Sequence, residues 1–210
     1  GHLLRQLQIP EAISSAHRTP STQNSVEPAE LEGTTMPVHD RSSFENLYAG
    51  QPRWEIGRPQ KAILAAADHI TGSILDVGCG TGENALYFAS LGHKVTGLDF
   101  LEEPINLAKQ KAVERELTAT FLVMSALVLK ELPEVFDSAI DSGLFHVFSD
   151  EDRRLYVDGL ASVLKPGGRL MFSTCTTNVR ENEEQAAWAL STLPLELDRL
   201  PAPPGFAPVQ

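Results

Sequence analysis

The chain has 210 residues, of which 42% are hydrophobic and 21% are charged, proportions that exclude a wholly disordered chain and a membrane protein. Its 17 Lys and Arg residues against 28 Asp and Glu residues leave a net charge of -11, which disfavours nucleic acid as a partner because phosphate binding depends on Lys and Arg. No apolar stretch approaches the roughly 20 residues of a spanning helix, so we expect a cytoplasmic protein with no membrane partner.

The composition divides the chain into three parts. Residues 1–43 are rich in Ser, Thr, Pro and Gln and indicate an N-terminal arm. Gly1 and His2 are typical of a cloning remnant, and Met36 is a candidate natural start. Residues 44–193 carry the apolar periodicity of a folded domain, and residues 194–210 form a proline-rich tail.

Strand-like and helix-like segments alternate within the predicted domain. The predicted strands are residues 73–78, 94–99, 118–124, 135–141 and 169–174, and the predicted helices are residues 83–91, 103–115, 150–164 and 181–193. Strands separated by helices indicate right-handed crossovers. The predicted fold class is therefore α/β, a Rossmann-like doubly wound and mostly parallel sheet, whose ligands bind at the carboxyl ends of the strands.

A glycine-rich turn, DVGCGTG at residues 76–82, follows the first predicted strand. A dinucleotide-binding turn would place its third glycine at position 83, where this chain has Glu83. A carboxylate there is unfavourable for a pyrophosphate at the helix N-terminus. Asp99 ends the second strand, where a carboxylate can accept hydrogen bonds from both hydroxyl groups of a ribose. These features indicate a nucleoside ligand without phosphates, joined to a cationic group.

Four segments in order resemble the successive motifs of class I S-adenosylmethionine-dependent methyltransferases. They are ILDVGCGTG at residues 74–82, VTGLD at 95–99, FDSAID at 136–141 and LKPGG at 164–168. The resemblance extends over about residues 44–175. It implies S-adenosyl-L-methionine as the cofactor and S-adenosyl-L-homocysteine as its product.

The resemblance also implies which residues bind the cofactor. Gly78, Gly80 and Gly82 would line its methionine portion, Asp99 would hold the ribose, and Phe100 would pack beside the adenine. A serine stands where many relatives have an acidic residue that binds the adenine amino group. That serine is Ser125. The other residues predicted to bind the cofactor are Asp76, Cys79, Asn84, Ala126 and Asp141.

The segment ahead of the first strand, residues 48–60, also carries a resemblance. Together with residues 141–148 it is similar to the small-molecule branch that includes thiopurine and tellurite methyltransferases, in which an N-terminal segment closes over the cofactor. Trp54 would cover the sulfonium by a cation–π attraction worth about 0.5–2 kcal/mol, and Arg58 would pair with the cofactor carboxylate. The alternative is that Trp54 packs as an ordinary apolar residue and Arg58 is solvated.

Methyl transfer from a sulfonium is an in-line displacement, so alignment and exclusion of water can supply most of the catalysis. His146 is the best placed general base, and Asp141 is the second predicted catalytic residue. Phe44, Tyr48 and Phe145, with His146, would bind the acceptor. The alternatives are a structural histidine and an aromatic core. We therefore expect methyl transfer to a small-molecule sulfur, nitrogen, oxygen, halide or metalloid nucleophile.

Two other functions remain open. Residues 172–184 resemble the Thr-Cys motif of RNA cytosine-C5 methyltransferases, in which Cys175 would be the nucleophile. Residues 141–143, however, lack the Pro-Cys pair of that family, and the net charge of -11 opposes RNA. The other alternative is a module that binds S-adenosylmethionine without catalysis. The spacing of the two cysteines predicts no metal site.

The C-terminal hairpin that usually completes such a sheet looks incomplete. Only residues 195–197 could start another strand before the prolines of the tail intervene. An uncovered strand edge invites aggregation. We therefore expect the N-terminal arm, the tail or a second subunit of a homodimer to cover the edge beside residues 169–174.

Overall fold

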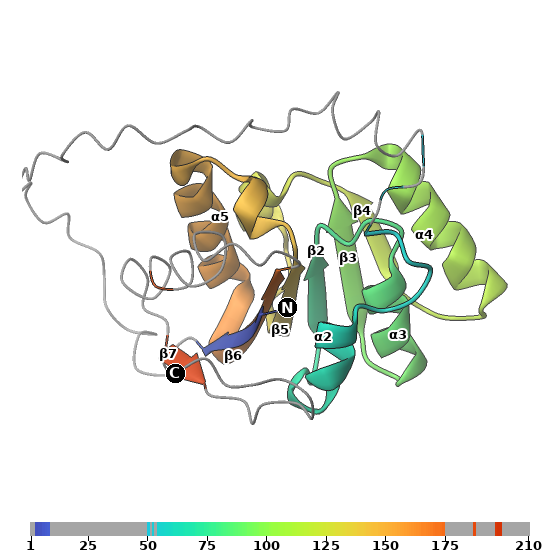
Figure 1. Ribbon diagram of the computed structural model, residues 1–210, viewed down its shortest axis with the longest axis horizontal. Coiled ribbons are helices and arrows are strands. Elements are labelled where there is room, and N and C mark those ends of the chain that lie inside the picture. Colours follow the sequence, from blue (N-terminus) through green and yellow to red (C-terminus); the bar gives the residue numbers. More distant parts are fainter. Residues whose placement is uncertain are drawn as a thin grey trace, which may run out of the picture.

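The computed structural model describes residues 54–174, the single residues Gly50, Pro52 and Ala187, and the two strands Leu3–Gln8 and Glu196–Asp198. One seven-stranded sheet organises this part of the chain. Its strand order is β4-β3-β2-β5-β6-β1-β7 (Figure 1). The first five strands of that order are parallel to one another, which confirms the predicted Rossmann-like sheet.

The five parallel strands occupy the predicted segments, and their bounds are β2 Ile74–Val77, β3 Val95–Asp99, β4 Thr120–Val123, β5 Phe136–Ser142 and β6 Leu164–Thr174. The largest difference lies in β6, which begins at Leu164 and not at residue 169. Leu164 pairs with Phe136, and after an irregularity Arg169 pairs with Ser138. The turn containing Gly167, which has a φ of 75°, is thus accommodated as a bulge inside the strand.

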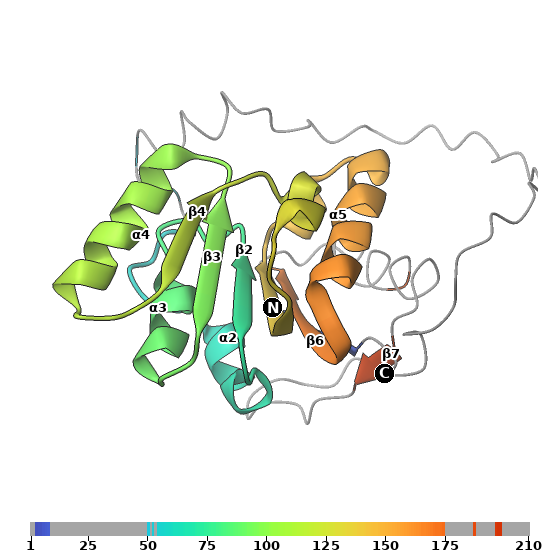
Figure 2. The same ribbon diagram turned by 180° about the vertical axis from the view of Figure 1, so that it is seen from behind.

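Helices cover both faces of the sheet. Their bounds are α2 Lys61–Ala65, α3 Glu83–Ser90, α4 Glu102–Glu114 and α5 Asp150–Val163, with 3₁₀ turns at Ala67–His69, Ala126–Glu131 and Phe145–Val147. In Figure 1 α2 lies in front of the sheet, and in the reverse view of Figure 2 α5 comes forward on the opposite face. The three long predicted helices are therefore confirmed to within one or two residues.

Alternating side chains of the strands fill two apolar cores. Leu75 and Val77 of β2 pack with α5 and the 126–131 turn, whereas Ile74 packs with α2, α3 and α4. The same alternation holds in β5, where Ala139 and Ile140 lie in different cores. Burial on both faces explains why the strands read as nearly continuous apolar runs.

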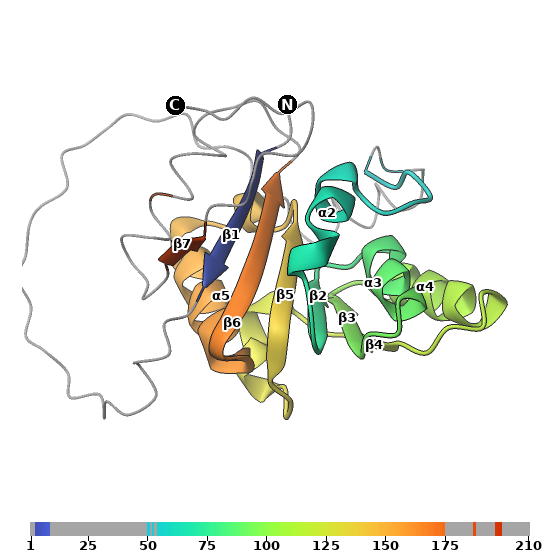
Figure 3. The same ribbon diagram turned by 90° about the horizontal axis from the view of Figure 1, so that it is seen from below.

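The edge of the sheet beside β6 is covered from within the same chain. Strand β1, Leu3–Gln8, pairs antiparallel with β6 from Leu3 opposite Thr174 to Gln8 opposite Arg169. Strand β7, Glu196–Asp198, pairs antiparallel with β1, and Figure 3 shows β1 lying alongside β6. The expectation that the edge is covered is confirmed, with the arm and the tail both contributing.

The sheet therefore takes in residues on both sides of the predicted 44–193 domain. Covering this edge needs no second subunit, so the homodimer stays an untested prediction. The predicted helix 181–193 lies outside the described residues apart from Ala187. In the part of the chain that the structure describes, no helix is long and apolar enough to cross a membrane.

Candidate functional site

The carboxyl ends of β2, β3 and β5 meet in the middle of the sheet. Val77 of β2 lies opposite Leu98 of β3 and Asp141 of β5. Three buried aspartates lie near these strand ends, Asp76, Asp99 and Asp141. The parallel register thus brings together carboxylates from three segments that are far apart in the sequence.

The glycine-rich turn between β2 and α3 packs too closely for larger residues. A Cβ atom on Gly82, whose φ is 82°, would lie 2.9 Å from the Cβ of Ala108 and 3.0 Å from the ring of Phe121. One on Gly78, whose φ is 68°, would lie 3.1 Å from the side chain of Leu144. Both positions combine a left-handed backbone with close neighbours, so only glycine is compatible with them.

Asp76 and Asp99 hold this turn through backbone hydrogen bonds. The Oδ2 atom of Asp76 accepts from the N–H of Ala85, 3.1 Å away in the first turn of α3. Asp99 accepts from the N–H of Gly80 at 3.1 Å through Oδ2 and from that of Leu101 at 3.0 Å through Oδ1. Each carboxylate oxygen can accept further hydrogen bonds, so these contacts leave Asp99 able to bind a ligand's hydroxyl groups.

Asp141 anchors the loop that follows β5. Its Oδ1 atom accepts from the backbone N–H groups of Leu144 at 2.9 Å and Phe145 at 3.3 Å. Its Oδ2 atom accepts from the hydroxyl of Tyr156 at 2.9 Å. With 0% of its surface exposed, Asp141 is placed to position the loop of His146, and its predicted contacts with cofactor and acceptor stay predictions.

Burial makes the ionised forms of these carboxylates unfavourable. Desolvation raises the pKa of Asp76 to about 7, helped by the nearby charges of Asp141 and Asp99. Desolvation likewise raises the pKa of Asp141 to about 6 and that of Asp99 above its usual value. Within the described part of the chain none of the three forms an ion pair.

A cationic ligand fits this arrangement, because its charge would favour the ionised carboxylates that burial disfavours. The sulfonium and ammonium groups of S-adenosylmethionine would supply that charge. The close-packed glycine turn and the backbone-anchored Asp99 also suit its methionine and ribose portions. Among the described residues, no three His, Cys, Asp or Glu side chains are grouped to hold a metal ion.

The remaining predicted cofactor residues surround the turn. Cys79 is half-buried, and burial raises its thiol pKa well above the usual value, so it is not poised as a nucleophile. Asn84 accepts a hydrogen bond from the backbone N–H of Gln60 at 3.0 Å. Trp54 is 41% exposed, and Arg58 is exposed. The structure thus brings the predicted N-terminal segment to the turn.

On the other side of the turn, Phe100 is half-buried, Ser125 is exposed and Ala126 is buried. The Ser125 hydroxyl accepts from the N–H of Leu127 at 3.2 Å and keeps a second lone pair for a ligand. These placements are compatible with the predicted adenine contacts, which stay predictions.

The predicted acceptor residues are placed only in part. Phe145 is 5% exposed, and its ring centroid lies 6.1 Å from that of Tyr156 and 5.6 Å from that of Phe172. His146 is half-buried, with its Cε1 atom 3.8 Å from where a Cβ on Gly143 would lie. The structure therefore puts Phe145 in the core and His146 nearer the surface. Three further predictions lie outside the described residues, namely Phe44, Tyr48 and Cys175.

Sequence reasoning missed the residues that support the site from α4 and α5. Arg153 lies 5.6 Å from the ring centroid of Phe145 and approaches the backbone oxygens of Phe145 and His146 at 3.5 Å. Lys111 contacts the glycine turn at Thr81. Both residues look like ordinary charges of a solvated helix face, so the sequence carries no signal that separates them from other lysines and arginines.

Comparison with known proteins adds an independent finding. Residues 74–168 match the family model described as a methyltransferase domain. That segment begins with β2 and includes the glycine turn and all three buried aspartates. The family model therefore matches the segment that builds the candidate site.

Relatives with assigned names support the same class. The chain is 38% identical over 135 residues to the 2-heptyl-1-hydroxyquinolin-4(1H)-one methyltransferase of Mycobacteroides abscessus. The matched segment covers 59% of this chain and 60% of that protein. The chain is 29% identical over 195 residues to the ubiquinone biosynthesis O-methyltransferase of Photorhabdus laumondii, with 85% of this chain and 72% of that protein covered. The chain thus spans less than two thirds of the first of these relatives.

Solved structures with the same fold include two of particular relevance. One, described as "Conversion of a Disulfide Bond into a Thioacetal Group during Echinomycin Biosynthesis", gives a TM-score of 0.59 at 42% identity, over 62% of this chain and 58% of that one. An S-adenosylmethionine-dependent methyltransferase from Clostridium acetobutylicum gives a TM-score of 0.50 at 18% identity, over 62% and 56% of the two chains. The latter likeness concerns the fold alone.

Proposed function

We propose that the protein is an S-adenosylmethionine-dependent methyltransferase whose acceptor is a hydroxyl group on a small aromatic or heteroaromatic molecule. The observation that carries the proposal is the group of three buried aspartates, which form no ion pair within the described residues, beside a glycine turn. A cationic nucleoside satisfies that group, and a phosphorylated one does not. The methyltransferase-domain match over residues 74–168 supports methyl transfer as the reaction.

When bound, the cofactor supplies an activated methyl group from its sulfonium. The protein's residues then have three tasks. Asp99 accepts the ribose hydroxyls and fixes the orientation of the nucleoside, while the glycine turn admits the close approach of the backbone. Asp141 and Tyr156 hold the loop that carries His146. The segment at Trp54 shields the site from water, which strengthens the electrostatic interactions inside it.

An acceptor hydroxyl must lose its proton as the methyl group arrives. We assign His146 as the base, because it is the titratable residue on the loop after β5 and is half-buried. An imidazole is the side chain most often used as a general base near neutral pH. Asp141 then acts by positioning the loop and not by contact with the acceptor, since its two oxygens bind the loop backbone and Tyr156.

The choice of an oxygen acceptor rests on the relatives. One is named for a 1-hydroxyquinolin-4(1H)-one, and another is named an O-methyltransferase. The predicted likeness to thiopurine and tellurite methyltransferases leaves sulfur and metalloid acceptors as the next candidates. For RNA cytosine methylation through Cys175 no observation in the described residues adds support, and the net charge of -11 still opposes it.

A panel of acceptors tests the proposal. The purified protein is incubated with S-adenosylmethionine and one acceptor at a time: a hydroxyquinolone, a catechol, a thiol, an N-heterocycle, a halide, a metalloid oxyanion or an RNA. Mass spectrometry measures the methylated product and S-adenosylhomocysteine. We expect turnover with the hydroxyl acceptors, unchanged in Cys175→Ala and lowered about 100-fold in His146→Gln. Tight cofactor binding without turnover of any acceptor would instead support a non-catalytic module.

A further inference from the structure

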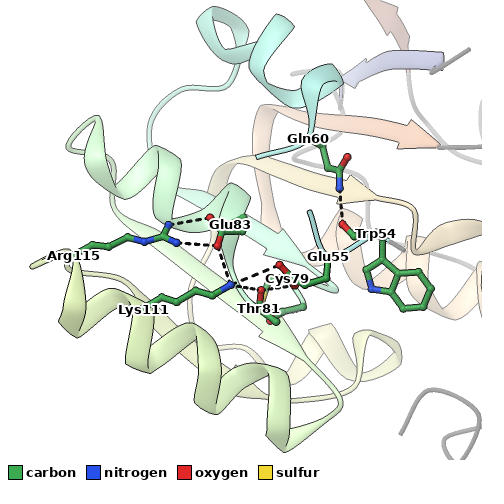
Figure 4. A network of polar contacts seen from close by, with 9 residues as sticks. Trp54, Glu55, Gln60, Cys79, Thr81, Glu83, Lys111 and Arg115 are labelled. Atoms are coloured by element: carbon green, nitrogen blue, oxygen red, sulfur yellow. Dashed lines mark hydrogen bonds and ion pairs between the residues drawn. The ribbon is translucent and has the colours of Figure 1, made fainter. Parts of the chain in front are cut away.

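A chain of polar contacts ties the N-terminal segment to the glycine turn and to α4. The hydroxyl of Thr81 donates to the Oε2 atom of Glu55. The same hydroxyl accepts from the Nζ atom of Lys111 at 2.5 Å. Lys111 also lies 3.7 Å from the Oε1 atom of Glu55. Figure 4 shows these side chains converging from three separate elements.

The contacts have a defined direction and little access to water. Lys111 can only donate and an ionised Glu55 can only accept, so the shared hydroxyl must accept from one and donate to the other. Thr81 is 3% exposed, and the side chains of Glu55 and Lys111 are 19% and 22% exposed. Charge-assisted hydrogen bonds in such surroundings are stronger than those on an open surface.

A second pair of charged residues, Glu83 and Arg115, lies beside the lysine. Glu83 accepts from Lys111 at 2.8 Å and, through both oxygens, from Arg115 at 2.9 Å. Burial raises the pKa of Glu83, but the hydrogen bonds from Arg115 and Lys111 outweigh burial and hold that pKa below its usual value. The cluster thus combines the carboxylates of Glu55 and Glu83 with the side chains of Lys111 and Arg115.

The same segment is fastened at its other end. The side-chain amide of Gln60 donates to the backbone oxygen of Trp54 at 3.0 Å, and the backbone N–H of Gln60 donates to Asn84 at 3.0 Å. Between the two attachments, residues 56–58 are exposed. In Figure 4 the side chains of Trp54 and Glu55 point in different directions, with only Glu55 directed toward the cluster. Glu55 therefore restrains the backbone that carries Trp54.

We propose that Glu55, Thr81 and Lys111 form a latch that holds the Trp54 segment closed on the glycine turn and slows the exchange of the bound nucleoside. The inference rests on the proposed function, because the exchanged ligand is S-adenosylmethionine or its product. Thr81 belongs both to the latch and to the turn that lines the ligand. Opening the latch therefore frees the segment and the turn together, and Glu55 and Lys111 are positioning residues and not catalytic ones.

The test measures how fast S-adenosylhomocysteine leaves, by rapid filtration of the radiolabelled ligand after addition of excess unlabelled ligand. Glu55→Gln and Lys111→Met are each expected to raise the dissociation rate about tenfold, as expected for loss of a charge-assisted hydrogen bond. The double variant should be no faster than either single variant, since both break one latch. Lys111→Arg should restore slow release.

Arg115→Gln is the matched control, because among the described residues the hydrogen bonds of Arg115 go to Glu83 and not to Glu55 or Thr81. Its dissociation rate should stay within about twofold of the wild-type rate. Equal acceleration by Arg115→Gln, or no acceleration by Glu55→Gln, would overturn the latch. If the wild-type protein bound no S-adenosylhomocysteine at all, the proposed function would fail as well.

A readout without ligand keeps the two failures distinguishable. Hydrogen exchange of the backbone amides at residues 54–57 reports directly on opening of the segment. We expect about tenfold faster exchange there in Glu55→Gln and Lys111→Met, and unchanged exchange in Arg115→Gln. Unchanged exchange in Glu55→Gln would remove the latch whatever the ligand experiment gave.

Discussion

The aspartates at the two ends of the parallel sheet have pKa values shifted in opposite directions. At the amino end, Asp137 accepts from the Nζ atom of Lys165 at 2.8 Å through each oxygen and from the N–H of Ser73 at 2.7 Å. The hydrogen bond from Lys165 is the main cause that lowers the pKa of Asp137 to about 2. At the carboxyl end, burial raises the pKa of Asp76 to about 7 and that of Asp141 to about 6.

The difference separates a structural contact from a binding site. At the amino end Lys165 supplies the cation, and Asp137 stabilises the folded chain at every pH at which its carboxylate is ionised. The carboxyl end buries its carboxylates without a cation from the described residues, at a cost in stability that a cationic ligand can offset. We infer that the carboxyl end is arranged for a ligand at the expense of the free energy of folding.

Removing Asp99, the carboxylate proposed to bind the ribose, should give the largest effect. In Asp99→Ala we expect the Kd for S-adenosylmethionine to rise about 100-fold, because two charge-assisted hydrogen bonds to hydroxyl groups are lost. Isothermal titration calorimetry measures the Kd. An Asp99→Ala protein that bound the cofactor as tightly as the wild type would remove Asp99 from the site and weaken the contrast between the two ends.

Neutralising the most strongly perturbed carboxyl should stabilise the protein. The folded-state pKa of Asp76 is about 7 and its usual value is 3.8. Below about pH 4 the carboxyl is protonated and its burial carries no charge penalty. That stability is lost as the pH rises through about 7, where the buried carboxyl ionises. Asp76→Asn should raise the free energy of unfolding at about pH 8 by roughly 2 kcal/mol, measured by urea denaturation. A loss of stability there would contradict the assigned cost of burial.

The loop of His146 should depend on the contact between Tyr156 and Asp141. In Tyr156→Phe one oxygen of a fully buried carboxylate loses its donor, which should lower the free energy of unfolding by about 1–2 kcal/mol. The KM for the acceptor should rise severalfold while the Kd for the cofactor stays within about twofold, since only the loop is loosened. Equal changes in both constants would indicate a general disturbance of the sheet.

The smallest effect is expected at the amino end. Lys165→Met removes a half-exposed ion pair and should cost about 0.5–1 kcal/mol of stability, with the Kd for the cofactor unchanged. A thermal melt and one titration check both values. Weaker cofactor binding in Lys165→Met would show that the ion pair at the amino end affects the binding site at the carboxyl end. The two ends would then not be independent.

The sequence predicted the parallel core of this fold well because that core depends on local patterns. Apolar runs mark β2, β3 and β5, and the spacing of the helices between them requires crossovers. The sequence also placed Asp76, Asp99 and the three glycines at the glycine-rich turn, because a turn after a strand constrains residue type, and their contacts with the cofactor stay predictions. The predicted role of Trp54 follows from resemblance and that of His146 from its place after the fourth predicted strand, and both roles stay predictions.

Other features depend on contacts between distant segments. Leu3–Gln8 is only a short apolar run in a polar arm, and its pairing with β6 joins two segments that are far apart in the sequence. Tyr156 and Lys111 are ordinary helix residues in the sequence. Their roles at Asp141 and Thr81 appear only when α5 and α4 pack on the sheet, which is why neither was predicted.

The central claim is that the buried carboxylates at the carboxyl end receive a cation. Calorimetric titration at about pH 5.5 and about pH 7 compares S-adenosylmethionine, which carries a sulfonium and an ammonium group, with S-adenosylhomocysteine, which carries the ammonium group alone. Lowering the pH protonates Asp76 and Asp141, so S-adenosylmethionine should bind several-fold more weakly at the lower pH, while S-adenosylhomocysteine changes much less. The same pH dependence for both ligands, or no binding of either, would contradict the account.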